Sequence, residues 1–202
     1  MTVTAPASPA GMRRRSRRAE AAILESTLAL LGEVGFSGLT MDGIAARAGV
    51  GKATIYRHWP SKAHVVVDAF RTHIPRLEAP DTGDLRDDLL AVMRHLAEGL
   101  SRSALSRILP SLVEAAEQDP DLRRLFAEFT TERRAVLRRI LEQAASRGEL
   151  RPDLDFEVAM DFLVGPIFTR RLITRKPLNR RFADQVVDLA LPVLRKSPPV
   201  ER

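Results

Sequence analysis

Residues 40–62 have the sequence TMDGIAARAGVGKATIYRHWPSK, and this stretch decides the fold. Thr40 is a favourable N-cap for a short helix over 41–47, which ends at Ala48-Gly49-Val50. A second short helix is expected over 51–59, where the proline that follows ends it. Helices of this length are not stable alone in water. We therefore expect both of them to pack on a neighbouring helix.

Apolar positions in this stretch predict how the two helices meet. Ile44 and Ala45 face inward from the first helix, and Ile55 and Trp59 fix the second helix against it. The small side chain of Ala45 allows a close crossing, and Gly49 supplies a backbone conformation that other residues resist. The pattern is a helix-turn-helix, whose second helix enters the major groove of DNA.

The flanking sequence is helical on the N-terminal side. An apolar stripe predicts a first helix over about 17–34, with Gly35 as a left-handed C-cap, and Ser61 is expected to cap a fourth helix that runs toward Ile74. Residues 1–12 are rich in Ala, Pro, Ser and Thr without periodicity, which predicts a disordered leader.

The C-terminal side is also helical, beyond a linker at 79–83. Expected helices cover about 84–100, 103–117 with a kink or split at Pro110, 120–148, 155–168 with a bend at Gly165-Pro166, and 180–196. The sequence has no period-2 strand pattern, so it predicts an all-α fold of about nine helices. The expected domains are a leader over 1–12, a helix-turn-helix domain with a basic arm over 13–62, a helical effector and dimerisation domain over 63–196, and a tail over 197–202.

Charge is distributed unevenly along the chain. The 202 residues include 32 basic and 26 acidic side chains, a net charge of +6. Residues 1–75 hold ten basic and five acidic side chains, a net +5, which leaves +1 for the other 127 residues. The asymmetry favours a polyanion-binding N-terminal part. The alternative is an arginine-rich composition, since 28 of the 32 basic residues are Arg.

The chain lacks the residues that several classes of function require. The chain has no Cys, and its four His residues have no metal-binding spacing. The segment Gly49-Val50-Gly51-Lys52 lacks the earlier glycine and the following hydroxyl of a phosphate-binding loop. Glu20 and Glu25 interrupt the apolar run of the first helix, which argues against a signal peptide or a membrane span. We therefore expect no catalytic residues, no metal, no cofactor, no membrane partner and a cytoplasmic location.

The helix-turn-helix stretch and its flanks resemble the DNA-binding domain of the TetR family of transcriptional regulators. The resemblance covers about 17–65 and rests on Gly35-Phe36-Ser37-Gly38-Leu39-Thr40, Ile44-Ala45, Ala48-Gly49-Val50 and Thr54-Ile55-Tyr56-Arg57-His58-Trp59-Pro60-Ser61-Lys62. One departure is Ala63-His64, where the family usually has an acidic residue after the Ser-Lys pair.

The resemblance implies a set of DNA-contacting residues. Those on or beside the recognition helix are Lys52, Ala53, Thr54, Tyr56, Arg57 and His58, and the helix N-termini at Thr40 and Lys62 face phosphates. For His58 the alternative is an ordinary surface position, and Trp59 is expected in the core. Five arginines precede the first helix, Arg13, Arg14, Arg15, Arg17 and Arg18, and they form either a DNA-contacting arm or a solubilising one.

The resemblance also implies an effector-binding core and a dimer. The expected pocket residues are Met93, His95, Leu96, Leu109, Val113, Phe126, Phe129 and Phe162. The alternative for each is plain core packing, and for His95 it is a surface or capping position. The expected dimer interface is formed by Phe162, Ile167, Leu172, Val186, Val187, Leu189, Ala190 and Leu194.

The function implied is that of a sequence-specific regulator. A homodimeric repressor would bind a double-stranded, pseudo-palindromic operator and leave it when an unidentified small-molecule effector binds. The alternatives are an activator, or an all-α small-molecule-binding protein without repressor function.

Overall fold

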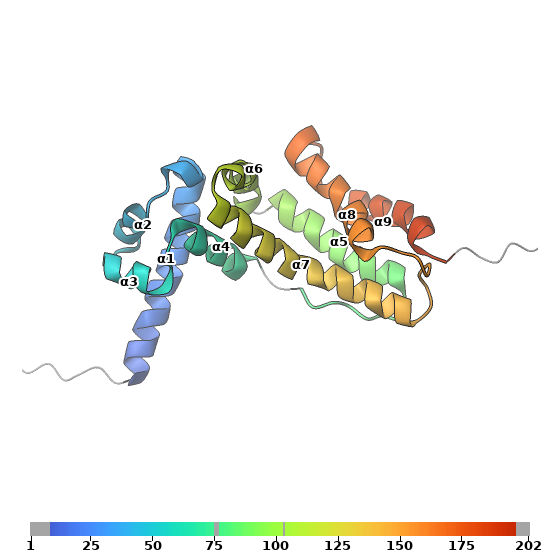
Figure 1. The fold of residues 1–202 in the computed structure, drawn as a ribbon, viewed down its shortest axis with the longest axis horizontal. Coiled ribbons are helices and arrows are strands. Elements are labelled where there is room, and N and C mark those ends of the chain that lie inside the picture. Colours follow the sequence, from blue (N-terminus) through green and yellow to red (C-terminus); the bar gives the residue numbers. More distant parts are fainter. Residues whose placement is uncertain (1–8, 75–76, 103, 197–202) are drawn as a thin grey trace, which may run out of the picture. The chain divides into compact units, whose positions relative to one another are not determined.

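The computed structural model describes residues 9–74, 77–102 and 104–196. Within these ranges the chain is all-α, without strands, as predicted (Figure 1). The helices are α1 (Pro9–Gly38), α2 (Met41–Ala48), α3 (Lys52–His58), α4 (Lys62–His73), α5 (Leu85–Arg102), α6 (Ala104–Gln118), α7 (Pro120–Ser146), α8 (Phe156–Phe168), the π-helix η1 (Thr169–Thr174) and α9 (Arg180–Leu194).

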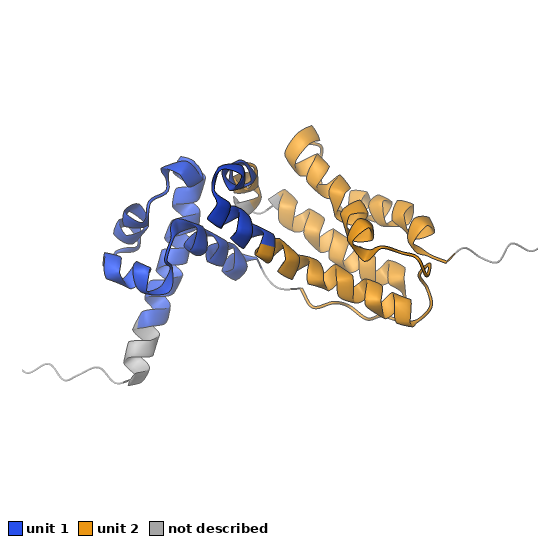
Figure 2. Ribbon diagram, viewed as in Figure 1, with its two compact units in different colours: residues 1–75, 111–127 blue, residues 76–110, 128–202 orange. Residues whose placement is uncertain are grey.

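The chain divides into two compact units (Figure 2). The first unit comprises 1–75 and 111–127, and the second comprises 76–110 and 128–202. The predicted boundary after residue 62 differs from this division, because α4 packs on α1 inside the first unit. Helices α6 and α7 are each divided between the two units, at residue 110 and at residue 127.

Helix α1 is longer than the predicted span of 17–34. It begins at Pro9, inside the expected leader, because residues 10–22 are mostly Ala, Arg, Glu and Met, which favour helix. Gly35 has a positive φ of 68°, but its ψ of 178° lies outside the left-handed helical region predicted for a C-cap, and after this break the chain is helical again as far as Gly38. Residues 1–8 of the expected leader and the tail at 197–202 lie outside the described residues.

Helix ends follow local side-chain chemistry. The Thr40 hydroxyl accepts a hydrogen bond from the Gly43 N–H at 3.0 Å, which caps α2 as predicted. Helix α6 runs through Pro110 as one helix, so the alternative of a split there is wrong, while α8 passes into η1 just after Pro166. A proline removes one backbone hydrogen bond, and side-chain packing around a helix can compensate for that loss.

The second unit is built around a continuous apolar core from α5, α7, α8 and α9. Leu89, Met93, Ile140, Leu163 and Val187 are all fully buried in it. Partly exposed ion pairs also join α5 to α9, where Arg94 donates two hydrogen bonds to Asp184, at 2.6 and 3.0 Å. These contacts determine which sides of α8 and α9 remain on the surface.

Candidate nucleic-acid interface

The turn between α2 and α3 follows from Gly49. Its φ of 65° and ψ of 33° place it in the left-handed region, as the sequence predicts. The Val50 N–H then donates to the Ala45 carbonyl at 3.0 Å, which closes the end of α2. Gly51 is the N-cap of α3, with an ordinary φ of −72°. The tight turn therefore depends on one glycine rather than on both.

The inner side of α3 is fixed by buried side chains. Ile44, Ala45, Ile55 and Trp59 are all buried, as predicted. The indole Nε1 of Trp59 donates to the Asp68 carboxylate of α4 at 2.9 Å. This hydrogen bond satisfies the buried ring and joins the C-terminal end of α3 to α4. The two short helices are thus held in one orientation.

The outer side of α3 carries the predicted contact residues. Ala53, Tyr56, Arg57 and His58 are exposed, Thr54 is half-buried, and Tyr56 keeps 53% of its surface accessible. In the described part of the chain, Arg57 forms no ion pair, so its planar guanidinium is available for a phosphate or a guanine edge. The structure therefore brings these five side chains onto and beside one exposed helix.

Lys52 has a partner that sequence reasoning missed. Its Nζ donates to the Asp42 carboxylate at 2.5 Å, and this bond raises the pKa of Lys52 above its ordinary value. Arg47 is paired in the same way with Glu33, at 2.6 Å. No periodicity connects residues ten or fourteen positions apart across a turn, so only the fold could reveal these pairs. Both pairs are exposed, which leaves Lys52 able to exchange Asp42 for a phosphate.

Thr40 and Lys62 make internal contacts. The Thr40 hydroxyl is occupied in capping α2. The Lys62 Nζ donates to the Phe36 carbonyl at 2.9 Å and lies 4.4 Å from the centre of the Phe36 ring. These side chains therefore stabilise the end of α1 and the start of α2, and their role as DNA contacts stays a prediction.

The predicted basic arm falls on α1. Arg17 and Arg18 are exposed on this helix, whereas the side chains of Arg13, Arg14 and Arg15 lie outside the described residues. The stretch of α1 from Ser16 to Gly38 is also the one described helix that is long and apolar enough to cross a membrane. Its residues Ile23, Leu24 and Leu31 are buried in the first unit.

Ser61 is the N-cap residue of α4, as predicted, but its side chain makes no capping hydrogen bond. Its hydroxyl instead donates to the Asp121 carboxylate at 2.8 Å, and His64 Nδ1 lies 2.9 Å from the same hydroxyl. The bond from Ser61, with that from Arg124, lowers the pKa of Asp121. The first turn of α7 is therefore joined to α4 within the first unit, a contact over 60 residues that no sequence signal indicates.

Two family models match the chain. Bacterial regulatory proteins of the tetR family match residues 23–69, the region that carries the helix-turn-helix, and the tetracyclin repressor-like C-terminal domain matches residues 79–190. The chain belongs to the TetR family. It is thus a DNA-binding transcriptional regulator, and its relatives are regulators rather than enzymes.

Similar proteins extend over most of this TetR-family chain. The HTH-type transcriptional regulator YdeS of Bacillus subtilis is 38% identical over 87% of the chain and 89% of its own length. A DNA-binding transcriptional repressor TetR of Mycobacteroides abscessus is 32% identical over 89% of the chain and 95% of its own length. The TetR family regulator SCO0332 has a solved structure that is 34% identical, with a TM-score of 0.70, covering 88% of this chain and 99% of that one.

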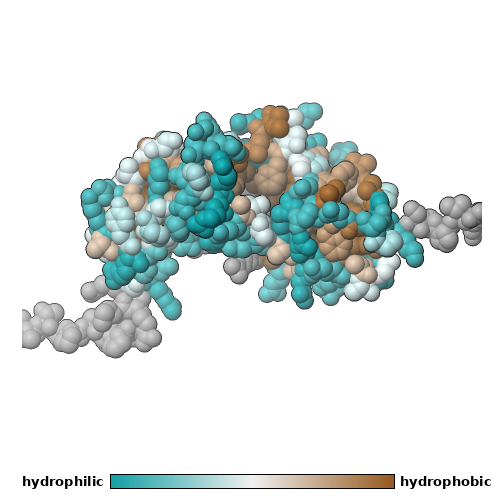
Figure 3. Space-filling view, in the orientation of Figure 1, coloured by the Kyte–Doolittle hydropathy of each residue, from teal (hydrophilic) through white to brown (hydrophobic). Residues whose placement is uncertain are grey.

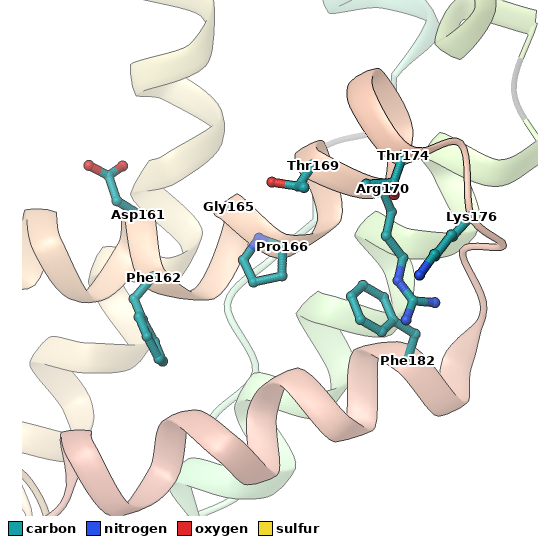
Figure 4. Close-up of a pocket in the computed structure, with 9 residues that line it drawn as sticks. All are labelled: Asp161, Phe162, Gly165, Pro166, Thr169, Arg170, Thr174, Lys176 and Phe182. Atoms are coloured by element: carbon teal, nitrogen blue, oxygen red, sulfur yellow. The ribbon is translucent and has the colours of Figure 1, made fainter.

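The expected pocket residues of this TetR-family protein lie in different surroundings. Met93, Leu109 and Phe129 are buried, Leu96 and Phe126 are half-buried, and His95 and Val113 are exposed. Phe162 lines an open cavity with residues of α8, η1 and α9 (Figure 4). Among the eight predicted residues, it alone contributes to that cavity.

The expected dimer residues divide into two groups. Ile167, Val186, Val187, Ala190 and Leu194 pack in the core of the second unit, with 0–5% of their surfaces exposed, so they offer almost no surface for an interface. Phe162 and Leu189 are exposed, and Leu172 is half-buried. Sequence periodicity had located the apolar positions but not the side of the helix that each one occupies. Hydrophobic surface gathers over α8, η1 and α9 (Figure 3), and its exposed members are Val158, Phe162, Ile173, Leu189 and Val193.

Proposed function

We propose that this protein is a ligand-released repressor that binds a pseudo-palindromic operator as a homodimer. The observation that carries the proposal is the outer side of α3, where Tyr56 and Arg57 are exposed while Ile55, on the inner side of the helix, is buried. A helix held from behind and exposed in front fits the major groove. The relative from Mycobacteroides abscessus, a DNA-binding transcriptional repressor, supports repression rather than activation.

Each side chain of α3 suits a part of duplex DNA. Arg57 would make a bidentate contact with guanine or a phosphate, and Lys52 would leave Asp42 for a phosphate. Ala53 would touch a thymine methyl group, while Thr54, Tyr56 and His58 would donate to phosphates. Arg17 and Arg18 would add charge from α1, and the helix starts at Thr40 and Lys62 would offer backbone N–H groups.

Dimerisation is supported by an exposed apolar stripe on α8 and α9. Val158 and Phe162 lie one turn apart on α8, with 64% and 49% of their surfaces exposed. Leu189 and Val193 lie one turn apart on α9, with 73% and 50% of their surfaces exposed. Apolar surface of this kind is best covered by a symmetric copy. Two recognition helices would then contact half-sites about 34–36 Å apart. As a regulator of genes, such a dimer works in the cytoplasm.

The proposal is tested by removing the two basic side chains of α3. The DNA for this test consists of genomic fragments of the source organism, selected because the unchanged protein binds them. In the Lys52→Ala, Arg57→Ala double variant we expect specific affinity to fall about a hundredfold or more, because each contact contributes about 1–3 kcal/mol. The salt dependence of binding should also become weaker, since fewer phosphates are neutralised.

A matched control is Arg139→Gln, an exposed arginine of α7 with no ion pair in the described part of the chain. It should bind the same fragments as tightly as the unchanged protein. Unaltered affinity in the double variant would contradict the repressor and favour a small-molecule-binding protein without DNA function.

A further inference from the structure

The cavity beside Phe162 has the size of a small-molecule site. Its volume is about 590 Å³, within the range of about 300–1,000 Å³ that is typical of ligand pockets. Figure 4 shows it between the C-terminal half of α8, η1 and the first turn of α9. Its apolar wall is formed by Phe162, Gly165, Pro166 and Phe182. A Cβ added at Gly165 would meet no atom within 4 Å, so the glycine leaves this side of the cavity open.

Two cations face this apolar wall. The guanidinium carbon of Arg170 lies 3.4 Å from the centre of the Phe182 ring, and its Nη1 donates to the Pro177 carbonyl at 2.9 Å. Arg170 is therefore held in place while its other N–H groups remain available, and Lys176 lines the same cavity. In the part of the chain that the structure describes, neither cation forms an ion pair. The one carboxylate of the lining, Asp161, is paired with Arg134 at 2.6 Å.

We propose that this cavity binds an amphipathic organic anion, a molecule with an apolar body and one carboxylate or sulfonate group. Its apolar body would lie on Phe162, Pro166 and Phe182, and its anionic group would accept hydrogen bonds from Arg170 and Lys176. A preorganised arginine favours an anion because little side-chain entropy is lost on binding. A neutral molecule of the same shape would offer neither cation an anionic partner.

The cavity shares Phe162 with the stripe proposed for dimerisation, whereas Val158, Leu189 and Val193 do not line it. Val158 precedes Phe162 by one turn, away from the cavity, and Leu189 and Val193 follow Phe182 by about two and three turns of α9. A second copy on the stripe would therefore contact the cavity at Phe162.

The neighbouring residue connects the cavity to α6. Arg171, next to Arg170 in η1, donates a hydrogen bond to the Ser106 carbonyl of α6. Because α6 continues into the first unit from residue 111, an anion that repositions η1 would act on a helix shared with the DNA-binding part. This regulatory role rests on the proposed function, whereas binding of the anion does not.

The test compares two dyes that share a ring system. 8-Anilinonaphthalene-1-sulfonate carries a negative charge, and N-phenyl-1-naphthylamine is its neutral counterpart. Fluorescence titration of the full chain should give tighter binding of the sulfonate. In Arg170→Gln, Lys176→Gln we expect its dissociation constant to rise about tenfold or more, because two charge-assisted contacts are lost, while binding of the neutral dye stays unchanged. The Arg139→Gln control should bind both dyes normally.

A second variant fills the cavity. Gly165→Leu places a side chain in open space within a helix, so circular dichroism should show an intact fold while both dyes lose binding. Equal affinity for the two dyes in the unchanged protein, or unchanged sulfonate binding in either cavity variant, would overturn the proposal.

Failure of this inference is distinguishable from failure of the proposed function. The Lys52→Ala, Arg57→Ala variant should bind the sulfonate dye normally, and both cavity variants should bind DNA normally in the absence of dye. The sulfonate should weaken DNA binding by the unchanged protein but not by the Arg170→Gln, Lys176→Gln variant. If it weakens neither, the regulatory role is wrong.

Discussion

The recognition part at 40–62 and the α8–α9 surface are held by contacts of different range. In the first, the bonds of Thr40 to Gly43, Lys52 to Asp42 and Trp59 to Asp68 span ten residues or fewer. Longer bonds start only at its C-terminal edge, from Ser61 to Asp121 and from Lys62 to Phe36, and beside its turn, from Arg47 to Glu33. In the second, α9 is joined to α5 through Arg94 and Asp184, 90 residues apart. A surface that depends on local contacts can be derived from a short stretch of sequence, whereas the other depends on how distant helices pack.

The two regions also differ in what they expose. Among the large apolar side chains of the recognition part, Tyr56 alone is exposed, and the rest of its surface is polar groups and small alanines. The α8–α9 surface exposes Val158, Phe162, Leu189 and Val193. Polar exposure suits DNA, and apolar exposure suits another protein surface. The difference can be tested by changing one region at a time.

The largest effect is expected inside the α8–α9 packing. Leu163 is fully buried in the core of the second unit. Leu163→Ala should lower the free energy of unfolding by about 2–5 kcal/mol, because the change removes apolar contacts and leaves a cavity. Urea unfolding at a fixed protein concentration measures this free energy, and the Arg139→Gln control should unfold with the same free energy as the unchanged protein. A loss below about 1 kcal/mol would mean that α8 does not pack as the core requires.

A smaller effect is expected on the exposed side of the same helix pair. Leu189→Asp places a charge in the proposed interface, where it would be buried without a partner. We expect the dimer dissociation constant to rise about thirtyfold or more, corresponding to at least about 2 kcal/mol, with helix content unchanged. Sedimentation equilibrium measures the shift. Gln118→Asp, an exposed site of the first unit, adds the same charge and should leave the dimer intact.

Sequence reasoning was most successful in the recognition part, for a physical reason. The Thr40 cap, the positive φ of Gly49 and the buried Ile55 and Trp59 each follow from a residue and its near neighbours. The all-α class and most helix positions were also predictable from apolar periodicity. The extension of α1 to Pro9 was missed because the Pro and Ser residues of 1–12 indicate disorder, although good helix formers follow Pro9.

The second unit was less predictable. Val186 and Leu189 are both apolar residues of α9, yet the first is buried and the second exposed. Periodicity identifies such positions but does not say which side of a helix faces α5. Long-range contacts were missed in both units: the Ser61 contact with Asp121 in the first unit spans 60 residues, and the Arg170 ring stack in the second depends on the π-helix η1. Both arise from tertiary packing and have no local signal.

The local character of the recognition part can be tested at two glycines that flank Val50. Gly49 has a φ of 65°, whereas Gly51 has a φ of −72°. Gly49→Ala should cost about 1–2 kcal/mol of stability, since a Cβ disfavours the left-handed region. Gly51→Ala should stay within about 0.5 kcal/mol. A Cβ at either position meets no atom within 4 Å, so the difference isolates backbone strain. Equal effects in thermal unfolding would contradict a turn that depends on Gly49 alone.

The smallest effect concerns the long-range ion pair between α5 and α9. The hydrogen bonds from Arg94 lower the pKa of Asp184, so this carboxyl loses its proton more readily in the folded chain than in the unfolded one. The resulting stability is fully present above the unfolded pKa of about 3.9 and is lost as the pH falls through the lower folded pKa. Because both side chains are partly exposed, Asp184→Asn should cost about 1 kcal/mol or less at pH 7.

The pH profile distinguishes this pair from a local one. The difference in unfolding free energy between the unchanged protein and Asp184→Asn should shrink on acidification from pH 7 to about pH 3, because protonation removes the same charge from Asp184. The Asp42–Lys52 pair joins neighbouring helices and is more than half exposed at both side chains, so Asp42→Asn should leave stability within about 0.5 kcal/mol at either pH. Equal profiles for the two variants would mean that the long-range pair contributes no more to the fold than an exposed local one.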